Sequence, residues 1–334
     1  MEKLRVEESK SPPKPLLNNR YEMVQKIGRG SYGSVYKVED KKAAEVYADP
    51  SLASARKYLA IKKMRLSPKQ LMNQGIDFTT LREIKILQEI KHENIIALTD
   101  VFYIKSTTFM AMELMKTDLW NLMIVPEVKL RIDHIKCIML QIFNGLKVLH
   151  KHWIIHRDLT PQNLLISEDG VLKYSDFGLS RFFAANDKPM TQNVVTLHYR
   201  APEILFGANY YGPQVDIWAA GCILGGLILK NVLFCGQDDI DQLSRIFSVV
   251  GTPSEETWEG VTELPNYVEF QKTEPQSFKV LFPGLDESLL DLLEHCLILD
   301  PNKRITLEEC LEHPFFNESP DPCLPNEIPL KDIS

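Results

Sequence analysis

The first third of the chain, after a polar N-terminal segment, is patterned mainly for β-strands. β-Branched and aromatic residues recur there in short runs that flank glycines or polar turns, which is typical of strands. One segment differs, because Leu81, Ile84, Leu87 and Ile90 fall at helical spacing and predict an amphipathic helix over 79–90. The predicted strands lie within 21–40, which holds two strands and a tight turn, and at 58–64, 101–104 and 108–114.

From Asp118 onward the apolar residues fall at helical spacing. One helix face is traced between residues 132 and 149, and the segment 214–230 is apolar nearly all round, as expected for a helix at the centre of a lobe. A strand-rich part of about 100 residues is thus followed by a helical part of about 200, which predicts the α+β class. Further helices are predicted at 238–250, 287–298 and 306–312.

Three segments show neither pattern. Residues 1–18 are polar and rich in proline, which predicts a disordered tail, and 40–57 predicts a loop insertion with room for a short helix. The proline-rich, acidic segment 317–334 predicts a second tail on the surface. We therefore expect one folded domain at 19–316, with a β-rich lobe at 19–115 and a helical lobe at 116–316.

The composition narrows the class of partner. The 334 residues carry 38 basic and 45 acidic side chains, a formal net charge of −7, which argues against direct binding of nucleic acid. Six cysteines show no metal-binding spacing, and free reduced thiols are expected, as in cytosolic or nuclear proteins. The N-terminus lacks the apolar core of a signal peptide, and the longest apolar stretch, 217–229, is too short to span a bilayer. No membrane partner is expected.

A glycine cluster, "GRGSYGSV", lies between the first two predicted strands. Gly28, Gly30 and Gly33, closed by Val35, let a backbone approach phosphates closely and point N–H groups at them. A simple glycine-rich hairpin turn explains the cluster equally well. It is not a dinucleotide fingerprint, because a strand follows it, and it lacks the Gly-Lys-Ser/Thr ending of a Walker loop.

Charged and amide residues at three further places suggest chemistry on a phosphate ester. Lys62 stands in a predicted strand after the apolar residues Ala60 and Ile61, and Glu83 on the predicted helix is a candidate to hold it. Asp158, Asn163 and Asp176 follow in the segments "HRDLTPQN" and "DFG". Carboxylate and amide oxygens suit Mg²⁺ held together with substrate phosphates. Asp158 is instead placed to orient an attacking hydroxyl and accept its proton.

Taken together and in this order, these motifs resemble those of the eukaryotic protein kinase family over residues 21–316. The resemblance implies a bilobal fold with ATP between a β-rich N-lobe and a mainly helical C-lobe. It implies that Lys62, paired with Glu83, holds the α- and β-phosphates. It also implies that Asp158 is the catalytic base, that Thr196 braces this base, and that Asn163 and Asp176 bind Mg²⁺.

The same resemblance implies an adenine site on the linker "MELMKTD". Met112 would guard the pocket, Glu113 and Met115 would offer backbone hydrogen bonds, and Asp118 would reach the ribose. On spacing alone, Met112 and Met115 are equally well explained as plain core residues. The implied ATP contacts are Ile27, Gly28, Gly30, Gly33, Val35, Ala60, Lys62, Met112, Glu113, Met115, Asp118 and Leu165.

Two further contacts that brace the active region are implied. Glu203 of "APE" is expected to pair with Arg304, and Asp216 is expected to brace the catalytic loop.

Several segments resemble the cyclin-dependent kinase group, and within it the CDK-activating, transcription-linked branch. They include "LREIKILQEIKH", "EDGVLKYSDFGLS" and "DQLSRIF". The resemblance implies a cyclin-like subunit, a third assembly subunit and protein substrates with Ser/Thr-Pro sites. It also implies a nuclear or cytoplasmic location and a role in cell-cycle or transcription control. Asp77 and Phe78 replace the Pro-Ser of cell-cycle members, which leaves the identity of the cyclin open.

Regulation by phosphorylation is implied at three positions. Thr191 matches the activating site, and Ser31 and Tyr32 match inhibitory sites, although a turn residue and hairpin packing explain the latter two equally well. A phosphate carries about −1.5 to −2 charge and orders a loop when arginines meet it. The arginines at the matching positions are Arg82, Arg157 and Arg181.

The substrate side of this region matches the family less completely. Val195 and Arg200 match residues that favour a proline after the phosphorylated residue, whereas His198 replaces an expected tryptophan.

Thr160 is the main departure from the family's pattern, because serine/threonine members carry a lysine there that contacts the γ-phosphate. Losing one preorganised cation slows phosphoryl transfer but does not abolish it. An active, slow kinase is favoured, and a pseudokinase scaffold is the alternative. A nucleotide-binding oxidoreductase, suggested only by the glycine cluster, is disfavoured by the strand that follows it.

Overall fold

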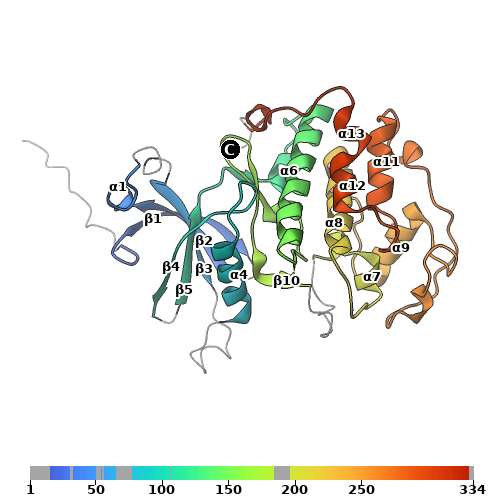
Figure 1. The fold of residues 1–334 in the computed structure, drawn as a ribbon, viewed down its shortest axis with the longest axis horizontal. Coiled ribbons are helices and arrows are strands. Elements are labelled where there is room, and N and C mark those ends of the chain that lie inside the picture. Colours follow the sequence, from blue (N-terminus) through green and yellow to red (C-terminus); the bar gives the residue numbers. More distant parts are fainter. Residues whose placement is uncertain are drawn as a thin grey trace, which may run out of the picture. The chain divides into compact units, whose positions relative to one another are not determined.

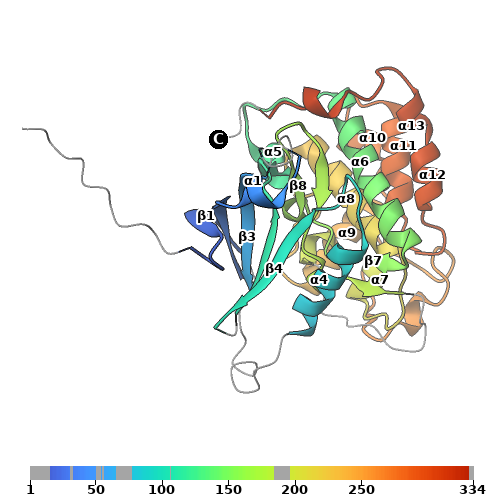
Figure 2. The same ribbon diagram turned by 60° about the vertical axis from the view of Figure 1, so that its left-hand side comes forward.

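The computed structural model describes residues 16–30, 33–49, 54, 56–64, 77–105, 107–183 and 196–330. These residues form two compact units, which are described separately (Figures 1 and 2). The first unit comprises 1–77 and 97–114, and the second comprises 78–96 and 115–334. The predicted lobe boundary at residue 115 lies one residue from the observed change at Leu114, while the predicted helix over 79–90 groups with the helical unit.

The first unit is built on an antiparallel sheet with the strand order β1-β2-β3-β5-β4. A short helix, α1 (Ala43–Val46), lies in the region predicted to be an insertion. The strands are β1 (Tyr21–Gly30), β2 (Gly33–Asp40), β3 (Tyr58–Met64), β4 (Leu98–Ile104) and β5 (Thr107–Glu113).

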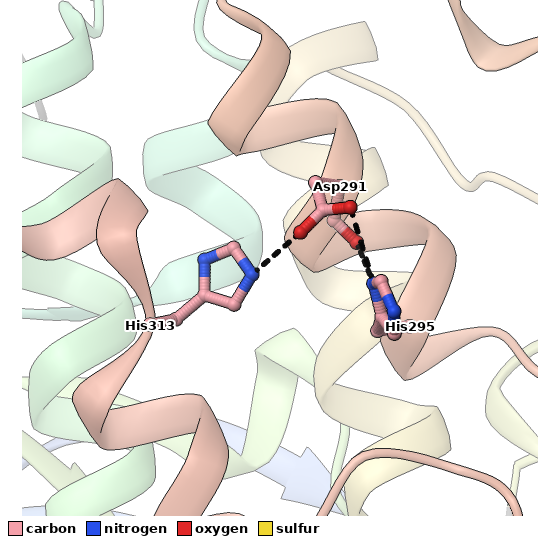
Figure 3. Close-up of side chains that lie close together, drawn as sticks. All are labelled: Asp291, His295 and His313. Carbon is pink, nitrogen blue, oxygen red and sulfur yellow. Dashed lines mark hydrogen bonds and ion pairs between the residues drawn. The ribbon is translucent and has the colours of Figure 1, made fainter.

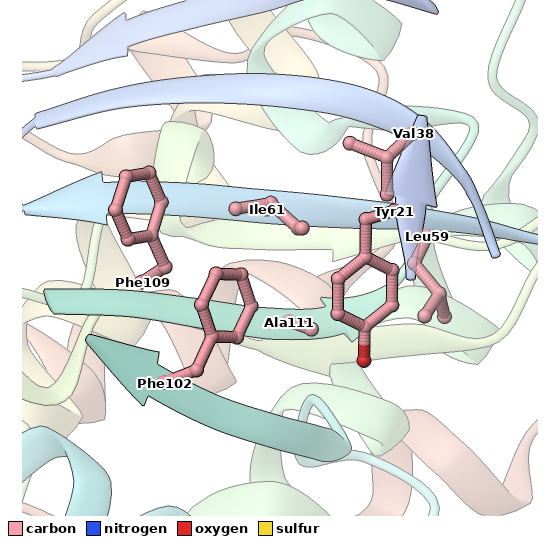
Figure 4. Close-up of a cluster of buried hydrophobic side chains, with 7 residues drawn as sticks. All are labelled: Tyr21, Val38, Leu59, Ile61, Phe102, Phe109 and Ala111. Carbon is pink, nitrogen blue, oxygen red and sulfur yellow. The ribbon is translucent and has the colours of Figure 1, made fainter. Parts of the chain in front are cut away.

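One face of this sheet carries the core of the unit (Figure 4). Stacked aromatic rings run across it, with centroid distances of 5.5 Å between Tyr21 and Phe102 and 5.2 Å between Phe102 and Phe109. Tyr21 keeps its polar end satisfied, because its hydroxyl donates to Asp100 Oδ2 at 2.8 Å. The remaining members are the buried aliphatic side chains of Val38, Leu59, Ile61 and Ala111.

The second unit is mainly helical. Its centre is α8 (Gln214–Leu229), which is buried along nearly its whole length, as its apolar sequence predicts. The longest helix is α6 (Ile132–Lys151), which contacts α8, and α11 (Glu287–Cys296) also packs against α8. The other helices are α4 (Phe78–Glu89), α5 (Leu119–Ile124), α7 (Pro202–Leu205), α9 (Asp239–Val250), α10 (Phe278–Leu281), α12 (Leu307–Glu312) and α13 (Pro314–Asn317).

Short strands and single 3₁₀ turns carry the segments that hold the predicted chemistry. The strands form two small sheets, ordered β6-β8-β9 and β10-β7. They are β6 (Thr117–Asp118), β7 (Ile154–Ile155), β8 (Leu164–Ile166), β9 (Leu172–Tyr174) and β10 (Arg181–Phe182). The 3₁₀ turns are η1 (Pro161–Asn163), η2 (Phe177–Leu179), η3 (Leu197–Tyr199), η4 (Val261–Glu263) and η5 (Pro325–Glu327).

The segment 317–330 is packed against α6, whereas its composition predicts only a surface tail (Figure 1). Lys136 of α6 is 1% exposed, and its ammonium donates to the carbonyls of Glu318 at 2.5 Å and Pro320 at 2.9 Å. Farther along, the carbonyl of Pro325 approaches Gly170 so closely that a Cβ there would lie 1.8 Å from it. This C-terminal strap is therefore part of the helical unit. Of the predicted N-terminal tail, residues 1–15 lie outside the described residues.

Candidate active site

The catalytic loop holds a backbone conformation that the rest of the helical unit stabilises. Arg157 has a φ of 64°, in the left-handed region that costs free energy for a non-glycine residue. Asp216 of α8 is 1% exposed and accepts the backbone N–H groups of His156 at 2.9 Å and Arg157 at 3.0 Å. The predicted bracing by Asp216 is therefore confirmed.

His150 completes this brace and was not predicted from the sequence. Its Nε2 lies 3.0 Å from Asp216 Oδ2, at the C-terminal end of α6. Burial raises the pKa of Asp216, but the hydrogen bond and charge of His150 and the bond from the His156 N–H outweigh it, so the net pKa is lowered. The carboxylate form of Asp216 is thus favoured. In the sequence, the one sign of this contact is that a polar residue directly follows the apolar face of the helix.

The ring of His156 links the catalytic loop to the segment that precedes Asp176. Its Nε2 lies 3.1 Å from the Ser175 carbonyl, and its Nδ1 accepts the N–H of Asp158 at 3.3 Å. These partners fit a neutral ring with its proton on Nε2. The ring also packs edge-on against Phe177, so the position of Asp158 is tied to the Asp176 segment.

Asp158, the predicted base, is held at both carboxylate oxygens. Oδ1 accepts the Thr196 hydroxyl at 3.0 Å and the Thr196 N–H at 3.1 Å, while Oδ2 accepts Asn163 Nδ2 at 3.0 Å. The predicted contact with Thr196 is therefore present. Donors fix the orientation of the carboxylate, and Oδ2, which accepts one of these bonds, has a further lone pair with which to accept a proton.

Asn163 presents the correct end of its amide for a metal. Nδ2 donates both to the backbone carbonyl of Asp158 at 2.8 Å and to its carboxylate, so these two acceptors require the NH₂ group on this side. The amide oxygen therefore faces away from Asp158. Ser175 fixes the backbone, because its N–H and hydroxyl both donate to the Asn163 carbonyl at 2.9 Å. An amide oxygen is a hard ligand that fits Mg²⁺.

Asp176, the other predicted metal ligand, also stands in the left-handed region, with a φ of 59°. It immediately precedes η2, and the Ser175–Asn163 bonds place its neighbour beside the first ligand. Strain of this kind persists only where the surroundings impose it and is common at functional sites. A carboxylate and an amide oxygen from these two residues fit the oxygen-rich ligand set of Mg²⁺.

Two of the three arginines predicted to meet a phosphate bind neighbouring carbonyls of η2. Arg82 of α4 donates to the Gly178 carbonyl at 2.6 Å, and Arg157 donates through Nε to the Leu179 carbonyl at 2.7 Å. Arg157 also donates to the Tyr211 hydroxyl at 2.9 Å. Arg181 lies in β10, paired with β7. Thr191 and Val195 lie outside the described residues.

The region after Thr196 is anchored by a buried ion pair. Arg304 donates through both terminal nitrogens to the Glu203 carboxylate, at 2.8 and 3.0 Å, and their side chains are 0% and 4% exposed. The predicted pair is therefore confirmed. Nearby, Arg200 bonds Asp239 at 2.7 Å, and His198 Nε2 lies 3.1 Å from the Gly236 carbonyl.

Thr160 is 3% exposed and therefore lies inside the catalytic loop. Its carbonyl accepts the N–H of Asn163 at 3.0 Å, at the start of η1. The backbone of this residue thus helps to position a predicted metal ligand, whatever its side chain does.

The first unit carries most of the predicted ATP contacts. On β3, Ala60 and Lys62 alternate with the core residues Leu59 and Ile61, so they point to the opposite face of the sheet. Ala60 lies opposite Met112 of β5. Both are buried, whereas Ile27 of β1 is 44% exposed.

The glycine cluster occupies the end of the β1–β2 hairpin. Gly28 pairs with Val35, and Gly30 pairs with Gly33. Only a glycine fits at position 33, because a Cβ would lie 2.1 Å from the Lys63 carbonyl oxygen. Ser31 and Tyr32 lie outside the described residues.

Glu113 has a structural contact at the end of β5, where its carboxylate accepts the Ala97 N–H at 2.7 Å. Glu83 belongs to the helical unit and is 1% exposed. Its pairing with Lys62, which lies in the other unit, stays a prediction.

Asp118, Met115 and Leu165 belong to the helical unit. Asp118 caps α5, because its Oδ1 accepts the Asn121 N–H at 2.8 Å. Burial raises the pKa of Asp118 in spite of this bond. Asp118 lies opposite Leu165 in the β6–β8 pair, and Met115 is half-buried. Contacts of these residues with a nucleotide stay a prediction.

Within the described part of the chain, no helix is both long and apolar enough to cross a bilayer.

Comparisons with known proteins agree over nearly the whole chain. The family model described as "Protein kinase domain" matches residues 21–316. "Cyclin-dependent kinase 7" of Caenorhabditis elegans is 40% identical over 315 residues, which is 94% of this chain and 92% of that protein. "Cyclin-dependent kinase 7" of Xenopus laevis is 41% identical over 315 residues, which is 94% of this chain and 86% of that protein.

A solved structure is similar as well. It is described as "Structure of the CAK complex form Chaetomium thermophilum bound to ATP-gamma-S". The match has a TM-score of 0.83 and 34% sequence identity, and it covers 93% of this chain and 95% of that one.

Proposed function

We infer that this chain, which belongs to the protein kinase family, transfers the γ-phosphate of ATP to serine or threonine residues of other proteins. The predicted bilobal kinase fold and the predicted likeness to the CDK-activating branch are confirmed. One observation carries the catalytic proposal: the carboxylate of Asp158 is held by Thr196 at one oxygen and by Asn163 at the other.

This arrangement supports phosphoryl transfer by positioning and charge. Asp158 accepts the hydrogen bond of the substrate hydroxyl and takes its proton as the oxygen attacks. Asn163 and Asp176 hold Mg²⁺ through oxygen atoms, and the ion supplies positive charge beside the phosphates when it is bound. Lys62 and the glycine cluster bind the phosphates of ATP.

The pseudokinase alternative gains no support from the relatives, whose names describe kinases. This chain keeps Lys62, Asp158, Asn163 and Asp176. Membership of the kinase family also removes the oxidoreductase alternative. We propose that Thr160 lowers the rate of transfer without abolishing it.

We propose that a cyclin-like subunit activates the chain, since relatives over 94% of its length are named as cyclin-dependent kinases. The helix α4 supports this proposal, because its residues Phe78 and Leu81 are 81% and 43% exposed. Large exposed apolar side chains of this kind are typical of a protein-binding surface. A third assembly subunit accords with the similar chain from a CAK complex.

We further propose Ser/Thr-Pro substrates, activation by phosphorylation at Thr191, and a role in cell-cycle or transcription control. The proposed location is nuclear or cytoplasmic. Arg82 and Arg157 support the regulatory proposal, because both already reach the segment that follows Asp176.

The test is a phosphotransfer assay with Mg²⁺-ATP and a Ser-Pro peptide. The wild type is compared with Asp176→Asn, each with and without candidate cyclins. We expect phosphate incorporation that a cyclin increases and that Asp176→Asn removes. Incorporation that is absent from the wild type under every condition would identify a scaffold. High activity that no cyclin increases would disprove the proposed regulation.

A further inference from the structure

A second cluster of side chains of the kinds that bind metals lies in the helical unit, and none of its members is a predicted kinase site residue (Figure 3). It consists of Asp291, His295 and His313, and we call it the α11–α13 cluster. Asp291 and His295 are one helical turn apart on α11, so they share one face of the helix. His313 directly precedes α13, and its side chain points toward Asp291.

The donor atoms of this cluster already converge. His313 Nε2 lies 2.9 Å from Asp291 Oδ2, and His295 Nδ1 lies 3.4 Å from Asp291 Oδ1. One ligand atom from each of the three residues lies within 4.8 Å of the other two. Zinc binds imidazole nitrogen and carboxylate oxygen at about 2.0–2.2 Å in a tetrahedron, which separates ligand atoms by about 3.3–3.6 Å. The 3.4 Å distance lies within this range, and the 2.9 Å distance is shorter, so His313 and Asp291 must move slightly apart to take an ion between them.

The exposure of the three side chains suits a site that takes up an ion from solution. Asp291 and His295 are 53% and 48% exposed, so both can turn toward a common centre and a water can complete the coordination. His313 is 8% exposed and provides a fixed point. Two imidazoles and one carboxylate favour a zinc-like ion over Mg²⁺ or Ca²⁺, which take oxygen ligands.

Each histidine has a competing hydrogen bond that a metal must replace. His313 Nδ1 accepts the Phe315 N–H at 3.3 Å, a long bond, and metal binding through Nε2 would move the ring proton to Nδ1. His295 Nδ1 also lies 2.8 Å from the Asp291 carbonyl, the usual i−4 contact on a helix. Because zinc needs an unprotonated ring nitrogen from each histidine, binding should weaken as the pH falls.

We propose that the α11–α13 cluster is a binding site for Zn²⁺, which joins the helix α11 to the residue that precedes α13. The site is independent of ATP and of Mg²⁺. It adds a link between two helices of the unit that carries the catalytic loop.

The test uses the full chain after removal of metals with a chelator. A Cys235→Ser background removes a competing thiol, because Cys235 is exposed and its sulfur lies 3.9 Å from His198 Nε2. Zinc binding is measured by equilibrium dialysis with metal analysis. We expect one Zn²⁺ per chain, with an affinity that falls at least about tenfold in His295→Ala and in Asp291→Asn. Mg²⁺ should not compete.

A matched control is available in His152→Ala. His152 is also exposed at the end of a helix, and its Nδ1 also lies 2.8 Å from the carbonyl four residues earlier, that of Val148. This variant should bind Zn²⁺ like the wild type. Kinase activity of each variant in Mg²⁺-ATP shows that it is folded.

Three results would overturn the proposal. The first is no Zn²⁺ bound by the wild type at a large molar excess of Zn²⁺. The second is equal loss of affinity in His152→Ala and His295→Ala. The third is a sulfur-to-metal charge-transfer band with Co²⁺, which would place the ion on a cysteine.

Discussion

The buried pair of Arg304 and Glu203 permits a sharp prediction about stability. Arg304 is held by more than its ion pair, because it also donates to the carbonyls of Gln214 at 2.8 Å and Ile298 at 2.9 Å. Its guanidinium lies 5.1 Å from the centroid of the Trp218 ring. The change Arg304→Met keeps much of the volume and removes all of these hydrogen bonds.

The expected loss of stability follows from the unpaired charge that remains in the variant. Glu203 would keep a charge on a side chain that is 4% exposed, and breaking a buried pair by removing one partner costs about 3–5 kcal/mol. That is a large part of a typical folding free energy of about 5–15 kcal/mol. At about 2–4 °C per kcal/mol for a unit of this size, the melting temperature should fall by about 6–20 °C.

The assay is thermal or urea unfolding of the purified chain, with Arg304→Met, Glu203→Gln and the double change Arg304→Met/Glu203→Leu. The double variant should recover much of the loss, because a well-packed apolar pair often replaces a buried ion pair without cost. Lys272 and Glu274 are the control pair, since they also lie 3.0 Å apart but are 83% and 78% exposed. Removing one partner of this exposed pair should have no measurable effect on the stability of the chain. Single buried variants that behave like this control would show that the pair of Arg304 and Glu203 does not stabilise the fold.

Three further predictions concern single side chains. Thr160→Lys should raise turnover on a Ser-Pro peptide, by up to about a hundredfold, since one preorganised donor is worth about that much; equal or lower turnover would show that the site has accommodated Thr160. Lys136→Met should lower the free energy of unfolding by about 2–3 kcal/mol and make the strap susceptible to proteases, because two carbonyls lose a charged donor. Unchanged proteolysis would show that Lys136 does not anchor the strap. The pKa of Asp216 is lowered in the folded state, so its contribution to stability is full above about pH 3.9 and is lost as the pH falls through the lower folded value. Asp216→Asn should therefore flatten the stability curve in that acid range, and an unaltered curve would exclude this contribution.

Local pattern was enough to predict the main elements of the fold. The predicted helix over 79–90 is α4 at Phe78–Glu89, and the predicted central helix over 214–230 is α8 at Gln214–Leu229. Both carry their information in the spacing of apolar residues within the segment. Short elements such as β7 and β10 have two residues each and no periodicity of their own. Such strands are set by contacts distant in sequence.

The active site shows the same division. Asp158, Asn163 and Asp176 were predicted from motifs that lie within 20 residues of one another. The brace from His150 was not predicted, because its partner Asp216 follows 66 residues later and His150 belongs to no family motif. The pair of Glu203 and Arg304 is farther apart in sequence and was predicted only because both residues belong to such motifs.

The strap was missed for a similar reason. A lysine on an amphipathic helix is expected to face water, and only carbonyls 182 and 184 residues away make the burial of Lys136 favourable. Only part of the α11–α13 cluster can be inferred from the sequence. Asp291 and His295 are four residues apart, but only the fold brings His313 to them.

We propose that Asp158, oriented by Thr196 and Asn163, is the base of an active kinase. Its most direct test is the steady-state kcat for a Ser-Pro peptide in wild type and Asp158→Asn, with Mg²⁺-ATP and the activating subunit. Asp169→Asn is the control, because Asp169 is an exposed carboxylate in the turn between β8 and β9. We expect a fall in kcat of about 10²–10⁴-fold for Asp158→Asn and no change for the control. A kcat within about threefold of wild type in Asp158→Asn would contradict it.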